Sequence, residues 1–504
     1  MFQPVNLGDL VDPAGDQSKI ALIDLLRDES PREYSYAEID AVARGVARLL
    51  TARGFAKGSR IAILSLNRAE YVATYFGIMR AGLVAVPVNA KLPAATVAYI
   101  IEDAEIELAF ADRERAGLVR PGLPVIGFDD DGPEGFAAQL DPGPFATHVP
   151  RSDEIGQQLY TSGSTGRPKG VPLSHAGQIW ALAQRGGQPG MEHERSIVAA
   201  PLFHMNGLFS TKLAFFNRAS MVLLPSFTAA SYIAAVARYR VTGLTSVPTM
   251  LARVAKEREL LARVDLSCVR RVTMGSAPLS EGLIERVRQV FPGAAVMNAY
   301  GTTEAGPAVF GAHPASIATP PLSLGYPLPG ADVRLVGGPS PEEGVLQMRN
   351  PSLMAGYHNL PEQTAKALVD GWYHSGDVCR RDENGFYYFV GRADDMFVCS
   401  GENIYPGEVE KQLEQHPAIH QASVVPLPDE ERGQVPVAFI VLRPGEELDY
   451  AAVKRFAIAG GPAYQHPRRV AFVAELPWAG TNKIDRKALL EEARQREAEG
   501  GWAT

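Results

Sequence analysis

The chain has 504 residues, of which 46% are hydrophobic, so it is long enough for more than one domain with large buried cores. Its 49 basic and 57 acidic residues give a formal net charge of −8, which argues against a general nucleic-acid-binding protein but permits local positive sites. The cysteines Cys268, Cys379 and Cys399 form no CxxC pair, so neither a zinc site nor a disulfide framework is indicated, and a cytoplasmic location is expected. We find no signal-peptide pattern and no apolar run that predicts a membrane span.

The first 110 residues alternate between helical and strand patterns. Ser35 and Glu38 predict a capping box at the start of a helix that ends at Gly54. The later predicted elements are a strand over 60–65, a helix from Asn67 to about Gly82, a strand over 83–88, a helix over 94–102 and a strand over 107–110. This alternation predicts βαβ units with parallel strands, and therefore an α/β fold. We expect this part to be a scaffold, because it carries no charged cluster that indicates chemistry.

The segment Tyr160–Val171, YTSGSTGRPKGV, combines three glycines with four Ser and Thr hydroxyls and two cations. Glycines allow main-chain N–H groups to face an anion at close range, and Arg167 and Lys169 add positive charge. We interpret the segment as a loop that wraps the phosphates of a nucleotide, in preference to a flexible Ser/Gly surface loop. A Walker-type ATPase is disfavoured, because no Lys-Ser or Lys-Thr pair follows the last glycine.

Three later stretches place polar groups at or after predicted strands. His204 lies in the apolar run APLFHMNGL, where a lone histidine is more often a core residue than a ligand. The stretches 245–250 and 272–278 each end a probable strand, which is where parallel sheets bind ligands. The motif NAYGTTE over 298–304 offers an aromatic face, hydroxyls and a carboxylate, which suit adenine, phosphate and Mg²⁺.

The pattern changes to a small α+β unit near residue 394. Pro406 predicts the start of a helix over 407–415. The remaining predicted elements are strands over His420–Val425, Val435–Leu442 and Arg469–Glu475 and a helix over Tyr450–Ala459.

These motifs together resemble those of the adenylate-forming superfamily, which contains acyl-CoA synthetases, peptide-synthetase adenylation domains and luciferases. The chain is most similar to AMP-forming CoA ligases of the 4-chlorobenzoate and fatty-acid types, and further matches are GWYHSGD, ending at Asp377, and the segments Val390–Glu410 and Pro477–Lys487. The resemblance covers nearly the whole chain. It implies a large N-terminal α/β domain of βαβ-rich subdomains over 1–393 and a small mobile α+β domain over 394–504, with a hinge at Asp394.

The resemblance also implies the substrates and the residue roles. ATP, Mg²⁺, coenzyme A and a small-molecule carboxylic acid are expected, and a homodimer is retained as a hypothesis. Catalytic roles are implied for Lys483, His204, Glu304, Thr161 and Lys169, and Mg²⁺ binding for Glu304 and Thr161. Nucleotide-binding roles are implied for Thr161, Ser162, Gly163, Ser164, Thr165, Gly166, Lys169, Gly275, Ser276, Ala277, Pro278, Asn298, Tyr300, Gly301, Thr302, Thr303, Asp377, Arg392 and Lys483. The acyl pocket would be lined by Phe203, His204, Met205, Gly207, Leu208, Val247, Thr249, Met274, Gly275 and Ala305, and CoA would contact Ser400, Gly401, Glu402 and Tyr464.

Some positions depart from the family pattern or have ordinary explanations. Asn482 stands where glycine usually precedes the C-terminal lysine, and Gln465 stands where lysine is common. A surface ion pair between Arg392 and Asp395 is the alternative to a ligand-binding Arg392.

We expect an ATP-dependent, AMP-forming CoA ligase that acts on an aromatic or aliphatic monocarboxylic acid through an acyl adenylate. One alternative is a malonyl-type dicarboxylate ligase that uses Arg253, although an ordinary solvated helix arginine also explains that residue. Another alternative is an acyl-AMP ligase that loads a carrier protein. A luciferase-type oxidative enzyme and a non-catalytic binding module rank lower.

Overall fold

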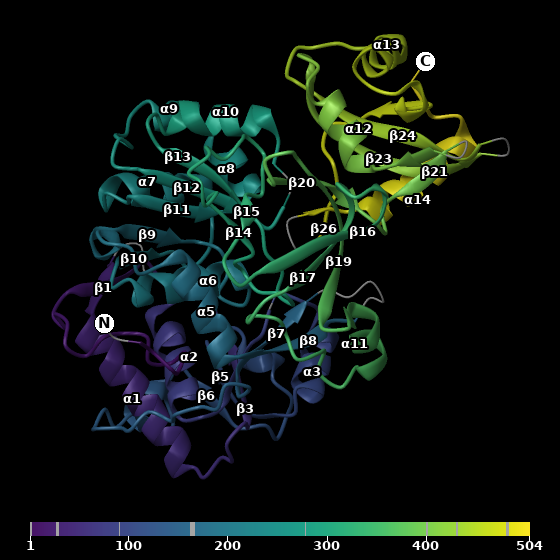
Figure 1. Ribbon diagram of the computed structural model, residues 1–504. Coiled ribbons are helices and arrows are strands. Elements are labelled where there is room, and N and C mark those ends of the chain that lie inside the picture. The colour runs from purple at the N-terminus through teal and green to yellow at the C-terminus, as the bar shows by residue number, and fades with distance from the viewer. Residues whose placement is uncertain are drawn as a thin grey trace. The chain divides into compact units, whose positions relative to one another are not determined.

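The computed structural model describes residues 3–26, 30–89, 91–161, 167–277, 279–399, 402–429, 432–479 and 483–503, with the backbone alone at 403, 433, 463 and 483. The chain divides into two compact units (Figure 1). Unit 1 comprises Met1–Thr319, Leu324–Val333 and Met348–His374, and unit 2 comprises Pro320–Ser323, Arg334–Gln347 and Ser375–Thr504. Among the described residues, no helix combines the length and the apolar character needed to cross a membrane.

The first sheet of unit 1 has seven strands in the order β13-β12-β11-β9-β10-β1-β2. Their bounds are β1 Ile20–Asp24, β2 Arg32–Ser35, β9 Arg195–Val198, β10 Ser220–Leu223, β11 Gly243–Ser246, β12 Arg271–Gly275 and β13 Ala295–Ala299. All neighbouring pairs are parallel except β1 and β2. The helices between these strands are α6 Met205–Phe216, α7 Ala229–Arg238, α8 Pro248–Val254, α9 Arg258–Leu261 and α10 Glu281–Val290. The carboxyl ends of the parallel strands therefore meet at one edge of the sheet.

Strand β9 marks the topological switch point of this sheet. The next strand in the chain, β10, lies on one side of β9, and β11 lies on the other side. Connections leave a switch point in opposite directions, and ligands of open α/β sheets bind in the crevice that this opens at the carboxyl ends. A ligand site is therefore expected beside the segments that follow β9 and β11.

The second sheet of unit 1 has the order β6-β5-β3-β4-β7-β8 and is parallel except for the β7–β8 hairpin. Its strands are β3 Arg60–Leu64, β4 Val84–Pro87, β5 Ile106–Ala111, β6 Val125–Gly127, β7 Ile155–Thr161 and β8 Lys169–Ser174. The accompanying helices are α1 Tyr36–Ala52, α2 Ala69–Arg80, α3 Ala94–Asp103, α4 Phe136–Gln139 and α5 His175–Arg185. The predicted capping box of α1 is confirmed, because Ser35 and Glu38 exchange both hydrogen bonds. The predicted βαβ alternation is confirmed as well.

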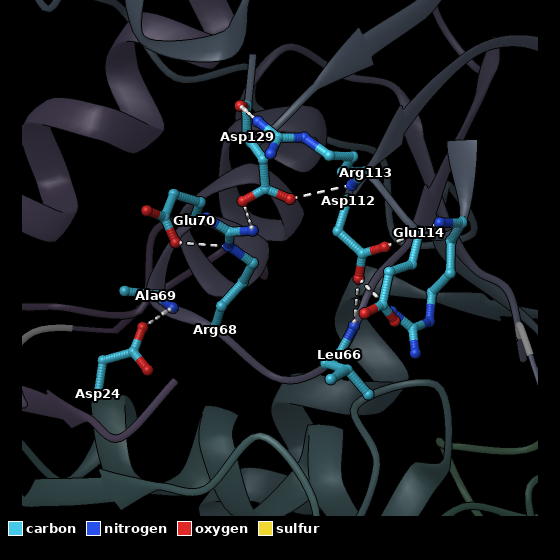
Figure 2. Close-up of polar contacts among 10 residues, drawn as sticks. Asp24, Leu66, Arg68, Ala69, Glu70, Asp112, Arg113, Glu114 and Asp129 are labelled. Atoms are coloured by element: carbon cyan, nitrogen blue, oxygen red, sulfur yellow. Dashed lines mark hydrogen bonds and ion pairs between the residues drawn. The ribbon is translucent and has the colours of Figure 1, made fainter. Parts of the chain in front are cut away.

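The second sheet also has a switch point, at β3, which lies between β4 and β5. Here the polar side chains pair with one another (Figure 2). Asp112, which follows β5, accepts a hydrogen bond of 3.0 Å from the main-chain N–H of Leu66. The buried Arg68 forms ion pairs with Glu70 at 2.9 Å and Asp129 at 2.7 Å. These contacts fix the segment that follows β3, as expected for the predicted scaffold.

The remaining elements connect the sheets or form unit 2. The short ones are the 3₁₀ turns η1 Ala116–Leu118, η2 Met191–His193 and η3 Ala463–Gln465, the strands β14 Phe310–Gly311, β15 Tyr326–Pro327 and β18 Leu368–Val369, and the helix α11 Pro361–Ala367. Strands β16 Asp332–Ser340, β17 Glu343–Arg349 and β19 Trp372–Arg381 run through both units, and β20 Tyr387–Arg392 pairs with β19.

Unit 2 contains a five-stranded sheet of β22-β21-β24-β23 with β25 on β24. The bounds are β21 Phe397–Cys399, β22 Glu402–Ile404, β23 Ile419–Asp429, β24 Gly433–Leu442, β25 Arg469–Phe472, β26 Trp478–Ala479, β27 Lys483–Ile484, α12 Pro406–Leu413, α13 Tyr450–Gly460 and α14 Arg486–Glu499. The predicted α+β pattern is confirmed, although the strand predicted over Arg469–Glu475 ends at Phe472, where its pairing with β24 ends.

Candidate active site

The carboxyl ends of β12 and β13 bring two of the predicted nucleotide-binding stretches together in unit 1. In their parallel register, Met274 lies opposite Asn298 and Gly275 lies opposite Ala299. A Cβ atom on Gly275 would lie 2.8 Å from the Ala299 carbonyl oxygen, so only glycine permits this approach. The next residue, Ser276, has a φ of +68°, which is unusual for a residue with a side chain. Backbone strain of this kind clusters at ligand sites.

Tyr300 follows β13 and begins a tightly folded turn. Its ring meets that of Phe310 edge to face, with 5.8 Å between the centroids, and this contact orients the ring. A Cβ atom on Gly301 would lie 2.7 Å from the carbonyl oxygen of Gly306, so this turn also requires glycine.

Glu304, in the same turn, is only 9% exposed and is held on several sides. The Thr302 hydroxyl accepts a hydrogen bond of 2.9 Å from the Ala305 N–H, and the Glu304 carbonyl accepts one of 2.8 Å from the Met354 N–H. The Tyr357 hydroxyl donates a hydrogen bond of 3.0 Å to Glu304 Oε1. The carboxylate therefore has a defined orientation.

The predicted phosphate loop connects the antiparallel strands β7 and β8, whose last register pairs join Tyr160 to Gly170 and Thr161 to Lys169. In the part of the chain that the structure describes, the buried Thr161 Oγ1 has no hydrogen-bond partner. The Lys169 ammonium lies 4.1 Å from the centroid of the Tyr357 ring. An unpartnered hydroxyl and a cation thus flank the loop. The predicted residues Ser162, Gly163, Ser164, Thr165, Gly166 and Pro278 lie outside the described residues.

Several of the predicted acyl-pocket residues follow the two strands at the switch point of the first sheet, β9 and β11. His204 follows β9 and stands at the N-cap position of α6, and its ring meets that of Phe203 at 4.6 Å. Val247 and Thr249 follow β11 on the other side of β9. Met274 and Ala305 are buried. The topology thus brings the segments after β9 and β11, which are distant in sequence, to neighbouring strand ends.

Arg253 is an exposed residue in the last turn of α8. An arginine that recognises a second substrate carboxylate is expected to face the pocket. The exposed position favours an ordinary solvated helix arginine, and it disfavours the dicarboxylate alternative.

Asn67 is a residue that sequence reasoning did not select. Its buried side chain donates hydrogen bonds of 3.0 Å to the carbonyls of Ala200 and Leu224, and its Oδ1 accepts one of 2.9 Å from the Leu202 N–H. The segment that leads to His204 is therefore held by the switch point of the second sheet. From the sequence, Asn67 could be recognised only as a residue at the start of a helix. Its role in holding this segment could not be predicted, because its three hydrogen-bond partners are distant in the chain.

The predicted ribose-binding pair lies in unit 2. Strands β19 and β20 place Asp377 opposite Arg392, and their side chains form an ion pair of 2.7 Å. Arg392 also lies 3.0 Å from Asp394. The alternative that pairs Arg392 with Asp395 is wrong, because Asp395 instead lies 3.8 Å from Arg486. Arg392 therefore has one partner set by the sheet register, Asp377, and one partner that is near in sequence, Asp394.

The predicted C-terminal residues also belong to unit 2. Lys483 lies in β27 opposite Ala479 of β26, and the structure describes its backbone alone. Gln465, where lysine is common, donates a hydrogen bond of 3.4 Å to Glu408, whose pKa is raised by burial and by the nearby Glu343. Of the predicted CoA contacts, Glu402 lies in β22 and Tyr464 lies in η3, whereas Ser400 and Gly401 lie outside the described residues.

Two family models match this chain. The model described as AMP-binding enzyme matches residues 12–358, and the model described as AMP-binding enzyme C-terminal domain matches residues 408–483. The chain belongs to the AMP-binding enzyme family. The predicted family resemblance and the prediction of an enzyme are therefore confirmed.

Individual members of the AMP-binding enzyme family are similar over almost their whole length. A feruloyl-CoA synthase of an Amycolatopsis species is 34% identical over 92% of this chain and 94% of its own. A fatty acid–[acyl-carrier-protein] ligase, ScoC of Streptomyces coeruleorubidus, is 31% identical over 91% of this chain and 92% of its own. The crystal structure of the anthranilate CoA ligase AuaEII in complex with anthranoyl-AMP is 27% identical, with a TM-score of 0.87, and covers 98% of this chain and 99% of its own. The predicted α/β fold is confirmed by this agreement.

The residues of this AMP-binding enzyme fit a nucleotide with a bound Mg²⁺. Glu304 offers a carboxylate, and Thr161 offers a hydroxyl that has no partner among the described residues; both are hard oxygen ligands of the kind that Mg²⁺ prefers. The described residues contain no group of three or more His, Cys, Asp or Glu side chains that could hold a metal. Mg²⁺ that has only one or two protein ligands is usually bound together with substrate phosphates.

Proposed function

We propose that the chain is an AMP-forming acid–CoA ligase whose substrate is an aromatic monocarboxylic acid. The observation that carries the proposal is the similarity to feruloyl-CoA synthase over 92% of this chain. The position of His204, Val247 and Thr249 around the switch point supports it, because this is where the topology favours a small-molecule pocket.

The first half-reaction joins two anions, so the protein must supply orientation and positive charge. A carboxylate oxygen of the acid bonds to the α-phosphorus of ATP, the bond to the β-phosphate oxygen breaks, and pyrophosphate leaves. In our proposal, the phosphate-loop segment with Lys169 binds the phosphates and Glu304 holds Mg²⁺, which would neutralise phosphate charge. The stretches around Ser276 and Tyr300 would hold the adenine.

The second half-reaction transfers the acyl group to sulfur. The CoA thiol gives up its proton, the thiolate sulfur bonds to the acyl carbon, the bond to the adenylate oxygen breaks, and AMP leaves. We propose Lys483 as the residue that stabilises charge in the first half-reaction, and Asp377 with Arg392 as the ribose contacts. We also propose Asp394 as the hinge between domains 1–393 and 394–504, which is supported by its position between the two matched segments.

Mass spectrometry of thioester products tests this function. Purified protein would meet ATP, Mg²⁺ and CoA with benzoates, hydroxycinnamates, fatty acids of increasing length, and malonate. We expect thioesters from aromatic acids. Thioesters from fatty acids alone would contradict the substrate class, and malonyl-CoA would restore a ligand role for Arg253.

A carrier-protein ligase is the second candidate, because ScoC is 31% identical over 91% of this chain. The same assay separates the two functions. Formation of an acyl adenylate without a CoA thioester, followed by acylation of an added carrier protein, would replace our proposal with this one.

A further inference from the structure

Tyr357 contacts two residues that have opposite charges and that the proposed function assigns to different tasks. Its hydroxyl donates to Glu304 Oε1 at 3.0 Å, and the face of its ring lies 4.1 Å from the Lys169 ammonium. The side chain is only 8% exposed. One buried aromatic ring therefore contacts both the carboxylate proposed for Mg²⁺ and the cation proposed for phosphate.

The backbone near Tyr357 is anchored to β8, to helix α11 and to the turn that carries Glu304, whose carbonyl accepts a hydrogen bond of 2.8 Å from the Met354 N–H. The N–H of His358 donates a hydrogen bond of 2.8 Å to the carbonyl of Gly170, the residue after Lys169. The N–H of Tyr357 donates one of 2.9 Å to Thr364 Oγ1 in the middle of helix α11. These bonds fix the ring between β8 and the turn that carries Glu304.

The position of the ring matters because Lys169 and Glu304 would lose their function if they paired with each other. In the part of the chain that the structure describes, these two side chains form no ion pair. An aromatic face attracts the ammonium without neutralising it, and a phenol hydroxyl orients a carboxylate while leaving its charge in place. Ligand carboxylates are commonly oriented in this way by a hydrogen-bonding neighbour.

We propose that Tyr357 is a positioning residue that orients the Glu304 carboxylate for Mg²⁺ and keeps the Lys169 ammonium available for phosphate. The proposal rests on the proposed function of the site. The hydroxyl of Tyr357 contacts Glu304, and its ring contacts Lys169, so two substitutions can separate the two roles. Y357F removes the hydroxyl and keeps the ring, and Y357L removes both.

Two binding titrations test the proposal without turnover. The first follows Mn²⁺ by electron paramagnetic resonance in the presence of an ATP analogue with a methylene bridge between the α- and β-phosphorus atoms. The second measures affinity for the same analogue without metal. We expect Y357F to weaken Mn²⁺ binding about tenfold, the lower end of the range for a lost carboxylate-orienting bond, with unchanged metal-free affinity. We expect Y357L also to lose metal-free affinity, because the Lys169 ammonium can then pair with Glu304.

A matched control is Y388F, which removes a tyrosine–carboxylate hydrogen bond of 2.9 Å, to Asp382, outside the proposed site. If Y357F binds Mn²⁺ as tightly as Y388F, Tyr357 does not orient Glu304 and the proposal is overturned. If Y357L keeps the metal-free affinity of Y357F, the ring does not protect Lys169. Should Y357L fail to fold, the comparison of Y357F with Y388F decides the metal-orienting role. A wild-type protein that binds both ligands but forms no thioester refutes the proposed function and leaves this test valid.

Discussion

Replacing Lys212 with methionine is expected to change how the stability of the protein depends on pH. Lys212 lies on α6 and is 0% exposed. Its ammonium donates hydrogen bonds of 3.0 Å to Gln157 Oε1 and 2.9 Å to Gln178 Oε1, and the Tyr75 hydroxyl donates to the same Gln157 oxygen. Burial lowers the pKa of Lys212 from 10.5 to about 7.

The sign of the effect follows from the two pKa values. Between pH 7 and 10.5 the amine of Lys212 is mostly neutral in the folded protein and protonated in the unfolded chain. The unfolded state therefore binds one more proton, and the contribution of Lys212 to stability rises with pH across this window. Each pH unit corresponds to about 1.4 kcal/mol, so the rise between pH 7 and 9 is about 2–3 kcal/mol. His175, which interacts with Lys212, has its pKa lowered to about 4 by burial and stays neutral in this range.

Urea unfolding at several pH values between 6.5 and 9 measures this contribution. The free energy of unfolding of wild type minus that of Lys212→Met is expected to increase by about 2–3 kcal/mol over the window. The absolute difference also contains the loss of the two Lys212 hydrogen bonds to the glutamine oxygens, so only the slope is diagnostic. Lys256→Met, at an exposed position, serves as the control with no change of slope. Parallel pH curves for wild type and Lys212→Met would show that Lys212 titrates normally and would refute the reasoning.

Three further predictions concern the proposed reaction. Asn67→Ala leaves three buried main-chain groups unpaired, so we expect a KM for the acid raised at least about tenfold and a lower melting temperature, measured by steady-state kinetics and calorimetry. An unchanged KM would mean that Asn67 does not position the segment before His204. Lys483→Ala is expected to lose adenylation and to keep thioester formation from supplied acyl adenylate. A loss of both half-reactions in a folded variant would contradict a role of Lys483 in the first half-reaction alone. Asp394→Pro is expected mainly to slow thioester formation, whereas normal turnover would refute the hinge.

The sequence was most informative where function resides in contiguous runs of residues. The phosphate-loop segment and the stretch from Asn298 to Glu304 each combine the required groups within a dozen residues, so they could be recognised without a structure. The α/β alternation and the Ser35–Glu38 cap were predictable for the same reason, since hydrophobic periodicity and capping are local.

The tertiary structure decided which distant residues support these motifs. Asn67 contacts Ala200, which is 133 residues away, and Tyr357 contacts Glu304 across 53 residues. Arg392 pairs with Asp377 because β19 and β20 lie in register, in addition to its local pair with Asp394. Such contacts depend on strand order and on the direction in which connections leave a switch point. Local periodicity does not encode that order, because the parallel strands of both unit 1 sheets are short runs of three to seven residues whose neighbours are chosen by packing.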